Sequence, residues 1–198
     1  MFTKYNKVQR AVLEATLLLI SEKDLQATSM ALISQKSGVS TGSIYHYFQS
    51  KEEIFNELYR GIVEFSSAVV LKDFSMSQSI QECFIRTWEN VIRFNMNYPT
   101  GFQFIEQYSF SPYIDETVKQ ETCKGGVYGS LSKLYTEAIK QQLFIDLEPK
   151  LMVQMHFGSV VYLTKAYFQK NIHLTDEIIQ RVIHSFWNAV SKEKSENR

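Results

Sequence analysis

Prolines, glycines and cysteines are scarce in this 198-residue sequence, which contains three, eight and two of them. So few turn-forming residues argue against a loop-rich protein. Cys83 and Cys123 have no CxxC spacing, so the sequence predicts neither a disulfide framework nor a zinc site. Apolar runs are short, with residues 17–20 among the longest, and the first residues lack the apolar stretch of a signal peptide. We therefore expect a cytoplasmic protein without a membrane segment.

An excess of positive charge is also missing, because 21 Lys and Arg residues balance 21 Asp and Glu residues. Net charge therefore gives no sign of a nucleic-acid partner. Lys4, Lys7 and Arg10 nevertheless open the chain with no acidic residue among them. Such a segment suits either an arm or first helix that lies near phosphates, or a solvated tail, and composition leaves these interpretations open.

Patterns that carry catalysis or metal binding are absent as well. The histidines have no carboxylate or cysteine at metal-ligand spacing, and the sequence has no GxSxG motif. Gly125, Gly126 and Gly129 lie in a helical context without the strand that a phosphate-binding loop requires. We expect no enzyme activity, no metal and no cofactor. The histidines concerned are His46, His156, His173 and His184.

Apolar residues spaced three and four apart are present along almost the whole chain. This spacing predicts helices, and no strand alternation accompanies it, so we expect an all-α fold of about nine helices. Pro112 and Pro149 are interpreted as first-turn prolines and Thr175 as an N-cap. The expected breaks after the fourth helix lie at residues 75–77, 98–101, 111–112, 148–149 and 171–175.

The first helices are predicted to pack as a small three-helix unit with a long fourth helix leading out of it. Amphipathic helices bury their apolar faces against one another. The face expected for the first helix consists of Val8, Ala11, Val12, Ala15, Leu18 and Leu19. Its expected partners are Met30, Ile33, Ile44, Phe48, Ile54, Phe55 and Leu58.

Residues 28–53, TSMALISQKSGVSTGSIYHYFQSKEE, contain local signals that all indicate one short structure. Thr28 is predicted to cap the second helix, and Gly38 to supply the left-handed residue that ends it. Ser40 is predicted to cap the third helix. The expected order is a helix, a tight turn, a short helix, a second tight turn and a long helix.

Two further sequence patterns predict where the short third helix begins and ends. Val39 and Ile44 have the spacing of a hydrophobic staple, which sets the angle at which the chain enters a helix. Ser50 and Glu53 have the spacing of a capping box at the start of the fourth helix. Both ends of the third helix are therefore defined by local sequence.

The two faces of the third helix differ. Ile44 and Phe48 are expected to point inward. The other side chains are small or have polar tips, so they can approach base edges and phosphates. The expected outward residues are Thr41, Gly42, Ser43, Tyr45 and His46, flanked by Thr28, Tyr47 and Lys51 as phosphate contacts. Two alternatives stay open, in which Tyr47 packs in the core and His46 is merely solvated.

The run TSM, GVS, GSIYHYF and SKEE resembles the amino-terminal domain of the TetR/AcrR family of regulators over residues 8–58. The resemblance implies a helix-turn-helix DNA-binding domain over residues 1–50 and a helical effector-binding and dimerisation domain over residues 51–198. It implies a homodimer that binds a palindromic operator in successive major grooves, in most cases as a repressor released by a ligand. Lys36 and Ser37 precede Gly38 where the family often has an alanine, a mild departure.

The second part of the chain is rich in aromatic residues at helical spacing, most of which must be core. A ligand pocket between helices needs a large apolar lining with a few polar groups. The candidates are Trp88, Phe104, Tyr108, Tyr128 and His156. For each of these residues, the alternative is a role in packing alone.

Residues 102–114 resemble a stretch found in a drug- and lipophile-responsive group of the same family, with Glu106 and Gln107 amid apolar neighbours. A buried carboxylate between aromatic walls favours cations, so an aromatic or cationic lipophilic effector is implied. Alternatively, Glu106 pairs with a lysine or caps a neighbouring helix.

The last two helices have apolar residues on more than one face, and the family resemblance implies that they form the dimer interface. The residues are Met152, Met155, Phe157, Val160, Val161, Leu163 and Tyr167, then Ile178, Ile179, Val182, Ile183, Phe186, Trp187 and Val190. We expect an effector to tilt the fourth helix, residues 51–72. The tilt would change the separation between the third helices of the two protomers, which are the recognition helices.

The alternative function is a helical ligand-binding or adaptor dimer that has lost DNA binding.

Overall fold

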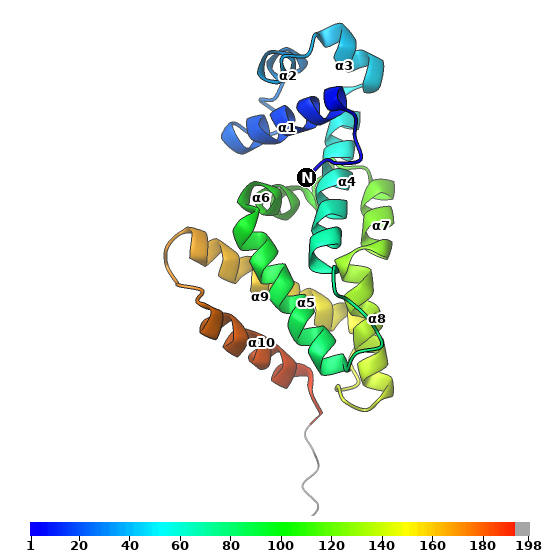
Figure 1. The fold of residues 1–198 in the computed structure, drawn as a ribbon, viewed down its shortest axis with the longest axis vertical. Helices are drawn as coiled ribbons and strands as arrows, with labels where there is room; N and C mark the ends of the chain where they lie inside the picture. Colours follow the sequence, from blue (N-terminus) through cyan, green and yellow to red (C-terminus); the bar gives the residue numbers. More distant parts are fainter. Residues whose placement is uncertain (193–198) are drawn as a thin grey trace, which may run out of the picture. The chain divides into compact units, whose positions relative to one another are not determined.

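The computed structural model describes residues 1–192, and this part of the chain contains ten α-helices and no strand (Figure 1). The predicted all-α fold is confirmed. The helices are α1 (Lys7–Glu22), α2 (Met30–Ser37), α3 (Thr41–Tyr47), α4 (Lys51–Val70), α5 (Ile80–Asn97), α6 (Pro99–Tyr108), α7 (Glu116–Gly125), α8 (Val127–Lys140), α9 (Pro149–Phe168) and α10 (Asp176–Val190). No helix in residues 1–192 combines the length and hydropathy that a membrane crossing needs.

A break that the sequence analysis missed accounts for the tenth helix. α7 ends at Gly125, and Gly126 adopts an extended conformation (φ −93°, ψ −162°) as the N-cap of α8. The expectation that these two glycines belong to one helical stretch was therefore wrong. Glycine gains little from staying helical, so two in succession allow the chain to leave one helix and start another.

The prolines and the last N-cap were predicted with mixed success. Pro149 occupies the first turn of α9 and Thr175 caps α10 by accepting from the Ile178 amide, as predicted. Pro112 lies in the turn between α6 and α7, and α7 does not begin until Glu116, so its assignment as a first-turn proline was wrong. Proline suits a turn as well as a first helical turn, and spacing alone did not distinguish the two.

The helices pack as two compact units. The first unit comprises Met1–Ala68 and Tyr98–Lys124, and the second comprises Val69–Asn97 and Gly125–Arg198. α1, α2, α3, α6 and most of α4 and α7 belong to the first unit, whereas α5, α8, α9 and α10 belong to the second. Packing therefore groups α6 and α7 with the helix-turn-helix. The functional division at residue 50 stays a prediction.

The core of the first unit contains the residues predicted for it, with one correction. Ile33, Ile44, Phe48, Ile54, Phe55 and Leu58 are all buried. Leu18 of α1 is 47% exposed, whereas Leu13, Leu17 and Ile20 are buried. The expected α1 face was therefore wrong at Leu18. α1 packs against α2 and α3 and also against α6, which draws residues outside the expected stripe into the core.

The core of the second unit is built from aromatic rings. α5 packs against α8, α9 and α10 (Figure 1). The fully buried side chains of Phe84, Trp88, Tyr135 and Phe144 meet edge to face or tilted, with ring centroids 5.2–6.4 Å apart where they are in contact. Such geometry is the preferred one for aromatic pairs. The expectation that most of the aromatics form core holds for this cluster.

Candidate nucleic-acid interface

The turn between α2 and α3 is built from local capping interactions. Gly38 ends α2 in the left-handed conformation (φ 69°), as predicted. Ser40 caps α3 by accepting from the Ser43 amide at 3.2 Å, also as predicted. The N-cap of α2 is Ser29, which accepts from the Leu32 amide, so the prediction of Thr28 as this cap was wrong. Both residues are of the capping type, and their sequence alone does not show which one takes the role.

Thr28 instead supports the unit from inside. Its side chain is fully buried, and its hydroxyl donates to the Asp24 carbonyl at 2.7 Å. A side chain in this position does not reach the surface of the unit. Ser29, the exposed neighbour that the sequence analysis missed, occupies the helix start where Thr28 was expected to be.

The start of α4 has half of the predicted capping box. Ser50 accepts from the Glu53 amide at 3.2 Å. The Glu53 carboxylate accepts from the Gln49 amide at 2.5 Å, one residue before the position that a full box requires. Two hydrogen bonds, one from the Glu53 amide and one to the Glu53 carboxylate, therefore hold the turn that links α3 to α4.

α3 presents a polar and aromatic face opposite its buried residues. Ile44 and Phe48 are buried, whereas the five residues predicted to face outward are exposed. Tyr45 is 52% exposed and Tyr47 is 37% exposed, so the Tyr47 ring does not lie in the core. The rings of His46 and Tyr47 meet edge to face with centroids 4.9 Å apart. The exposed residues are Thr41, Gly42, Ser43, Tyr45 and His46.

Two features of this face suit close approach to a duplex. A Cβ built on Gly42 would meet no atom within 4 Å, so the backbone of the first turn of α3 is bare on its outer side. Lys51, at the start of α4, is half-buried, with its ammonium 5.6 Å from the centre of the Phe55 ring. Its charge therefore stays near the end of α3.

Two of the basic residues at the amino terminus, Lys4 and Arg10, contact other residues of the first unit. The Lys4 ammonium is 2.5 Å from a Glu64 carboxylate oxygen, and the Arg10 guanidinium is 3.4 Å from the Tyr5 carbonyl oxygen to which it donates. The segment before α1 is packed on the first unit, because Phe2 is 2% exposed. Neither a solvated tail nor a free arm describes this segment.

The five candidate pocket residues fall in different units. Phe104 and Tyr108 belong to α6 in the first unit, where both are buried, and the Tyr108 hydroxyl accepts from the Leu25 amide at 3.2 Å. Trp88, Tyr128 and His156 belong to the second unit. The five residues therefore do not form one cluster within either unit.

In the second unit, Trp88 and His156 are joined through a residue that the sequence analysis missed. The Trp88 indole N–H donates to the Tyr135 hydroxyl at 2.9 Å, and that hydroxyl lies 2.6 Å from Nδ1 of His156. Because a hydroxyl has one proton and two lone pairs, it accepts from Trp88 and also shares a hydrogen bond with Nδ1, whose direction depends on the tautomer of the imidazole. Burial lowers the pKa of His156 to about 4 and raises that of Tyr135.

Half-buried aromatic rings lie beside the hydrogen-bonded residues Trp88, Tyr135 and His156. The Phe157 ring centroid is 5.0 Å from that of Trp88, and it stacks on Tyr128 at 6.3 Å. The imidazole of His156 stacks on Phe186 at 4.7 Å. Tyr128 and Phe157 are both half-buried. Aromatic side chains therefore extend from the surface of the second unit to its buried hydrogen-bonded group, which includes Trp88.

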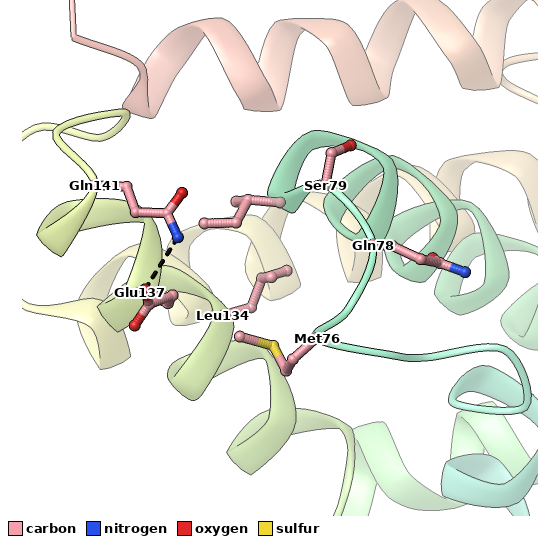
Figure 2. A pocket seen from close by; sticks show the side chains of 7 residues that line it. Met76, Gln78, Ser79, Leu134, Glu137 and Gln141 are labelled. Carbon is pink, nitrogen blue, oxygen red and sulfur yellow. Dashed lines mark hydrogen bonds between the residues drawn. The ribbon is translucent and has the colours of Figure 1, made fainter.

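Two small cavities have polar linings. One, of about 290 Å³ in the second unit, is lined by Met76, Gln78, Ser79, Ile80, Leu134, Glu137 and Gln141. Figure 2 shows Gln141 beside Glu137, to which its side-chain amide donates at 3.0 Å. The other, of about 160 Å³ in the first unit, lies between α1 and α6 and includes Phe104, Glu106 and Gln107. Glu106 is exposed, so the expectation of a buried carboxylate was wrong. Residues 1–192 contain no cluster of three metal-ligand side chains.

A short capped helix with an exposed polar face, following a left-handed glycine turn, defines a helix-turn-helix DNA-binding protein. The profile of the family "Bacterial regulatory proteins, tetR family" matches residues 12–58. That of "Tetracyclin repressor-like, C-terminal domain" matches residues 79–191, more than half of the chain. The chain belongs to the TetR family and is a helix-turn-helix transcriptional regulator.

Similarity to individual proteins covers most of the chain in some relatives and about a third of it in others. An uncharacterised HTH-type transcriptional regulator of Haemophilus influenzae is 23% identical over 182 residues, 91% of this chain and 94% of the relative. The repressor KstR2 of Mycobacterium tuberculosis is 37% identical over 59 residues, 30% of each chain. The solved structure of a TetR family regulator from Marinobacter aquaeolei has a TM-score of 0.85 at 21% identity, covering 93% of this chain and 96% of that one.

Proposed function

We propose that this regulator represses transcription by binding a palindromic operator as a homodimer, and that a small lipophilic or aromatic effector releases it. The observation that carries the proposal is the exposed polar face of α3, which is held by caps at both of its turns. Similarity to the KstR2 repressor over 59 residues supports repression as the output.

In this proposal α3 reads bases and its neighbours contact phosphates. Ser43 and Thr41 can donate to base edges, and the bare backbone at Gly42 allows α3 to lie deep in the major groove. Tyr45 and His46 add flat rings with polar tips. Ser29, Tyr47 and Lys51 are placed to contact phosphates and so to set register. Thr28 is left out of this surface because it is buried.

The dimer is proposed to form through α9 and α10. On α9, Leu151, Met155 and Tyr162 are 47%, 56% and 77% exposed, and Ile178 on α10 is 37% exposed. Gly158, between Met155 and Tyr162, has open space on its outer side. Large exposed apolar side chains beside a small residue suit a close two-fold helix contact.

The effector is proposed to bind at the aromatic surface of the second unit, between Tyr128 and Phe157 and toward Trp88 and His156. The lining there is aromatic, and its polar groups are a neutral imidazole and a phenol. Such a site suits an uncharged lipophilic or aromatic molecule with one hydrogen-bonding group. Binding would change the tilt of α4, whose last residues belong to the second unit.

The first test is selection of binding sites from a random duplex pool. The winning duplex is then titrated at several salt concentrations with wild type, a Tyr45→Ala/His46→Ala variant and a Phe110→Ala control, since Phe110 is 86% exposed and far from α3 in sequence. We expect a palindromic winner, affinity that falls with salt, and a loss of about tenfold or more in the double variant alone. A folded dimer that enriches no sequence would overturn the proposal in favour of a ligand-binding adaptor.

Effector binding has its own test. A panel of uncharged aromatic and aliphatic molecules is screened for release of the selected operator, with wild type compared to Tyr128→Ala. We expect at least one lipophilic molecule to release wild type at lower concentration than it releases the variant. Release that Tyr128→Ala leaves unchanged would place the effector elsewhere.

A further inference from the structure

Residues 1–5, here called the N-terminal strap, are packed against the first unit rather than extended into solvent. Phe2 is 2% exposed and Tyr5 is 8% exposed, as buried as residues of the core. Both side chains belong to the same buried cluster as Ile54, Phe55 and Leu58. The burial of two aromatic rings at the start of the chain indicates a defined docking position.

The docking position is a notch in α4 at Gly61. A Cβ built there would lie 2.7 Å and 2.8 Å from two carbons of the Phe2 ring and 3.3 Å from a carbon of the Tyr5 ring. No side chain larger than hydrogen fits at these distances. Glycine inside a long helix costs about 1 kcal/mol relative to alanine, and here that residue makes the space that the Phe2 ring occupies.

Polar groups on the same face of α4 hold the strap. The Tyr5 hydroxyl lies 2.8 Å from a Glu57 carboxylate oxygen, to which it donates, and Lys4 pairs with Glu64 at 2.5 Å. Glu57, Gly61 and Glu64 are four and three residues apart, so they share one face of the helix. The strap is thus bound along two turns of α4.

The strap is also joined to α1 and α6. Asn6 follows it directly and caps α1 by accepting from the amides of Val8 and Gln9 at 2.9 Å each. On α6, a Cβ built on Gly101 would lie 3.3 Å from the Met1 methyl carbon. The strap therefore connects three helices of the first unit, one of which, α4, follows the recognition helix after three residues.

We propose that the N-terminal strap is a positioning element for operator recognition: by holding α4 against α1, it sets the angle of α3 and so the half-site spacing that the dimer accepts. The proposal rests on the proposed function as an operator-binding dimer. Half-sites lie about 34–36 Å apart in helix-turn-helix complexes. A small change in the angle of α3 therefore alters how strongly operator affinity depends on the spacing between half-sites. Lys4 serves this internal role through its ion pair with Glu64.

The test uses the selected operator and derivatives whose half-site spacing is one base pair longer or shorter. Phe2→Ala, Gly61→Ala and the double variant are compared with Phe110→Ala, which removes an exposed ring. We expect each single variant to reduce the ratio of affinities between the correct and altered spacings by about threefold to tenfold. Phe2→Ala should have little further effect in the Gly61→Ala background, because the added methyl has already displaced the ring.

Tyr5→Phe provides a second variant that keeps the ring and removes the hydroxyl bonded to Glu57. We expect the same loss of spacing discrimination at smaller size, with an unchanged melting temperature. If all strap variants weaken binding by one common factor at every spacing, the strap only stabilises the fold and the proposal is wrong. If wild type itself selects no operator, the proposed function fails, which is a separate result.

Discussion

Three buried polar groups illustrate what single residues contribute to this molecule. Trp88, Tyr135 and His156 come from α5, α8 and α9, and each satisfies the next by a hydrogen bond inside an aromatic core. Burial without such partners would cost several kcal/mol for the group concerned. Burial also favours the neutral form of the imidazole, because it lowers the pKa of His156.

The buried imidazole makes stability depend on pH. The pKa of His156 is lowered to about 4 from 6.5, so the unfolded chain binds the proton first as pH falls. The contribution to stability is present above pH 6.5 and is lost between pH 6.5 and about pH 4. We expect wild type to lose about 2 kcal/mol more than His156→Gln between pH 7 and pH 5 in urea unfolding at fixed protein concentration. Parallel losses in both proteins would contradict this assignment.

At the scale of elements, the helix-turn-helix is specified locally and the later helices are not. Gly38, Ser40 and Ser50 each act within four residues of their own position, so their roles could be predicted from neighbours in the sequence. The break between α7 and α8 lies at Gly125 and Gly126, where the local sequence permits a helix to end but does not require it.

Two glycines of the helix-turn-helix should respond in opposite ways to alanine. Both have open space where a Cβ would be, but Gly38 has a φ of 69° and Gly42 lies within α3. Gly38→Ala is expected to lower the free energy of unfolding by about 1 kcal/mol. Gly42→Ala is expected to raise it by up to about 1 kcal/mol while weakening operator binding, since a methyl group then covers the bare backbone.

Urea unfolding and titration of the selected duplex would be measured on both variants. Equal effects of the two substitutions on stability would show that backbone conformation at Gly38 does not matter. Unchanged operator affinity in Gly42→Ala would remove the proposed close approach of α3 to the groove.

At the scale of the whole molecule, four exposed large apolar residues of the second unit lie on α9 and α10, namely Leu151, Met155, Tyr162 and Ile178. Met155 and Tyr162 are 56% and 77% exposed, and they lie two turns apart on α9. Side chains of this size are not left exposed in groups without a partner surface. A two-fold contact would bring each face against its copy, so one substitution alters both sides of the interface.

Charge on this face should separate the protomers. In a Met155→Lys/Tyr162→Lys variant, like charges from two copies would meet, and we expect sedimentation as a monomer. Operator affinity should fall by about a hundredfold or more, because two linked half-site contacts become one. Phe110→Lys is the matched control, with a more exposed aromatic residue in the first unit. A double variant that remains dimeric would exclude this face as the interface.

The sequence by itself determined the helical class, the order of the helix-turn-helix and the exposed residues of α3, because caps, glycine turns and apolar spacing act over a few residues. Only the tertiary structure decided which of Thr28 and Ser29 caps α2, since the choice depends on which side chain the core buries. It likewise decided that Phe2 docks at Gly61 and that Tyr135 links Trp88 to His156. These contacts join residues that are 21 to 59 positions apart, and their geometry follows from how whole helices pack.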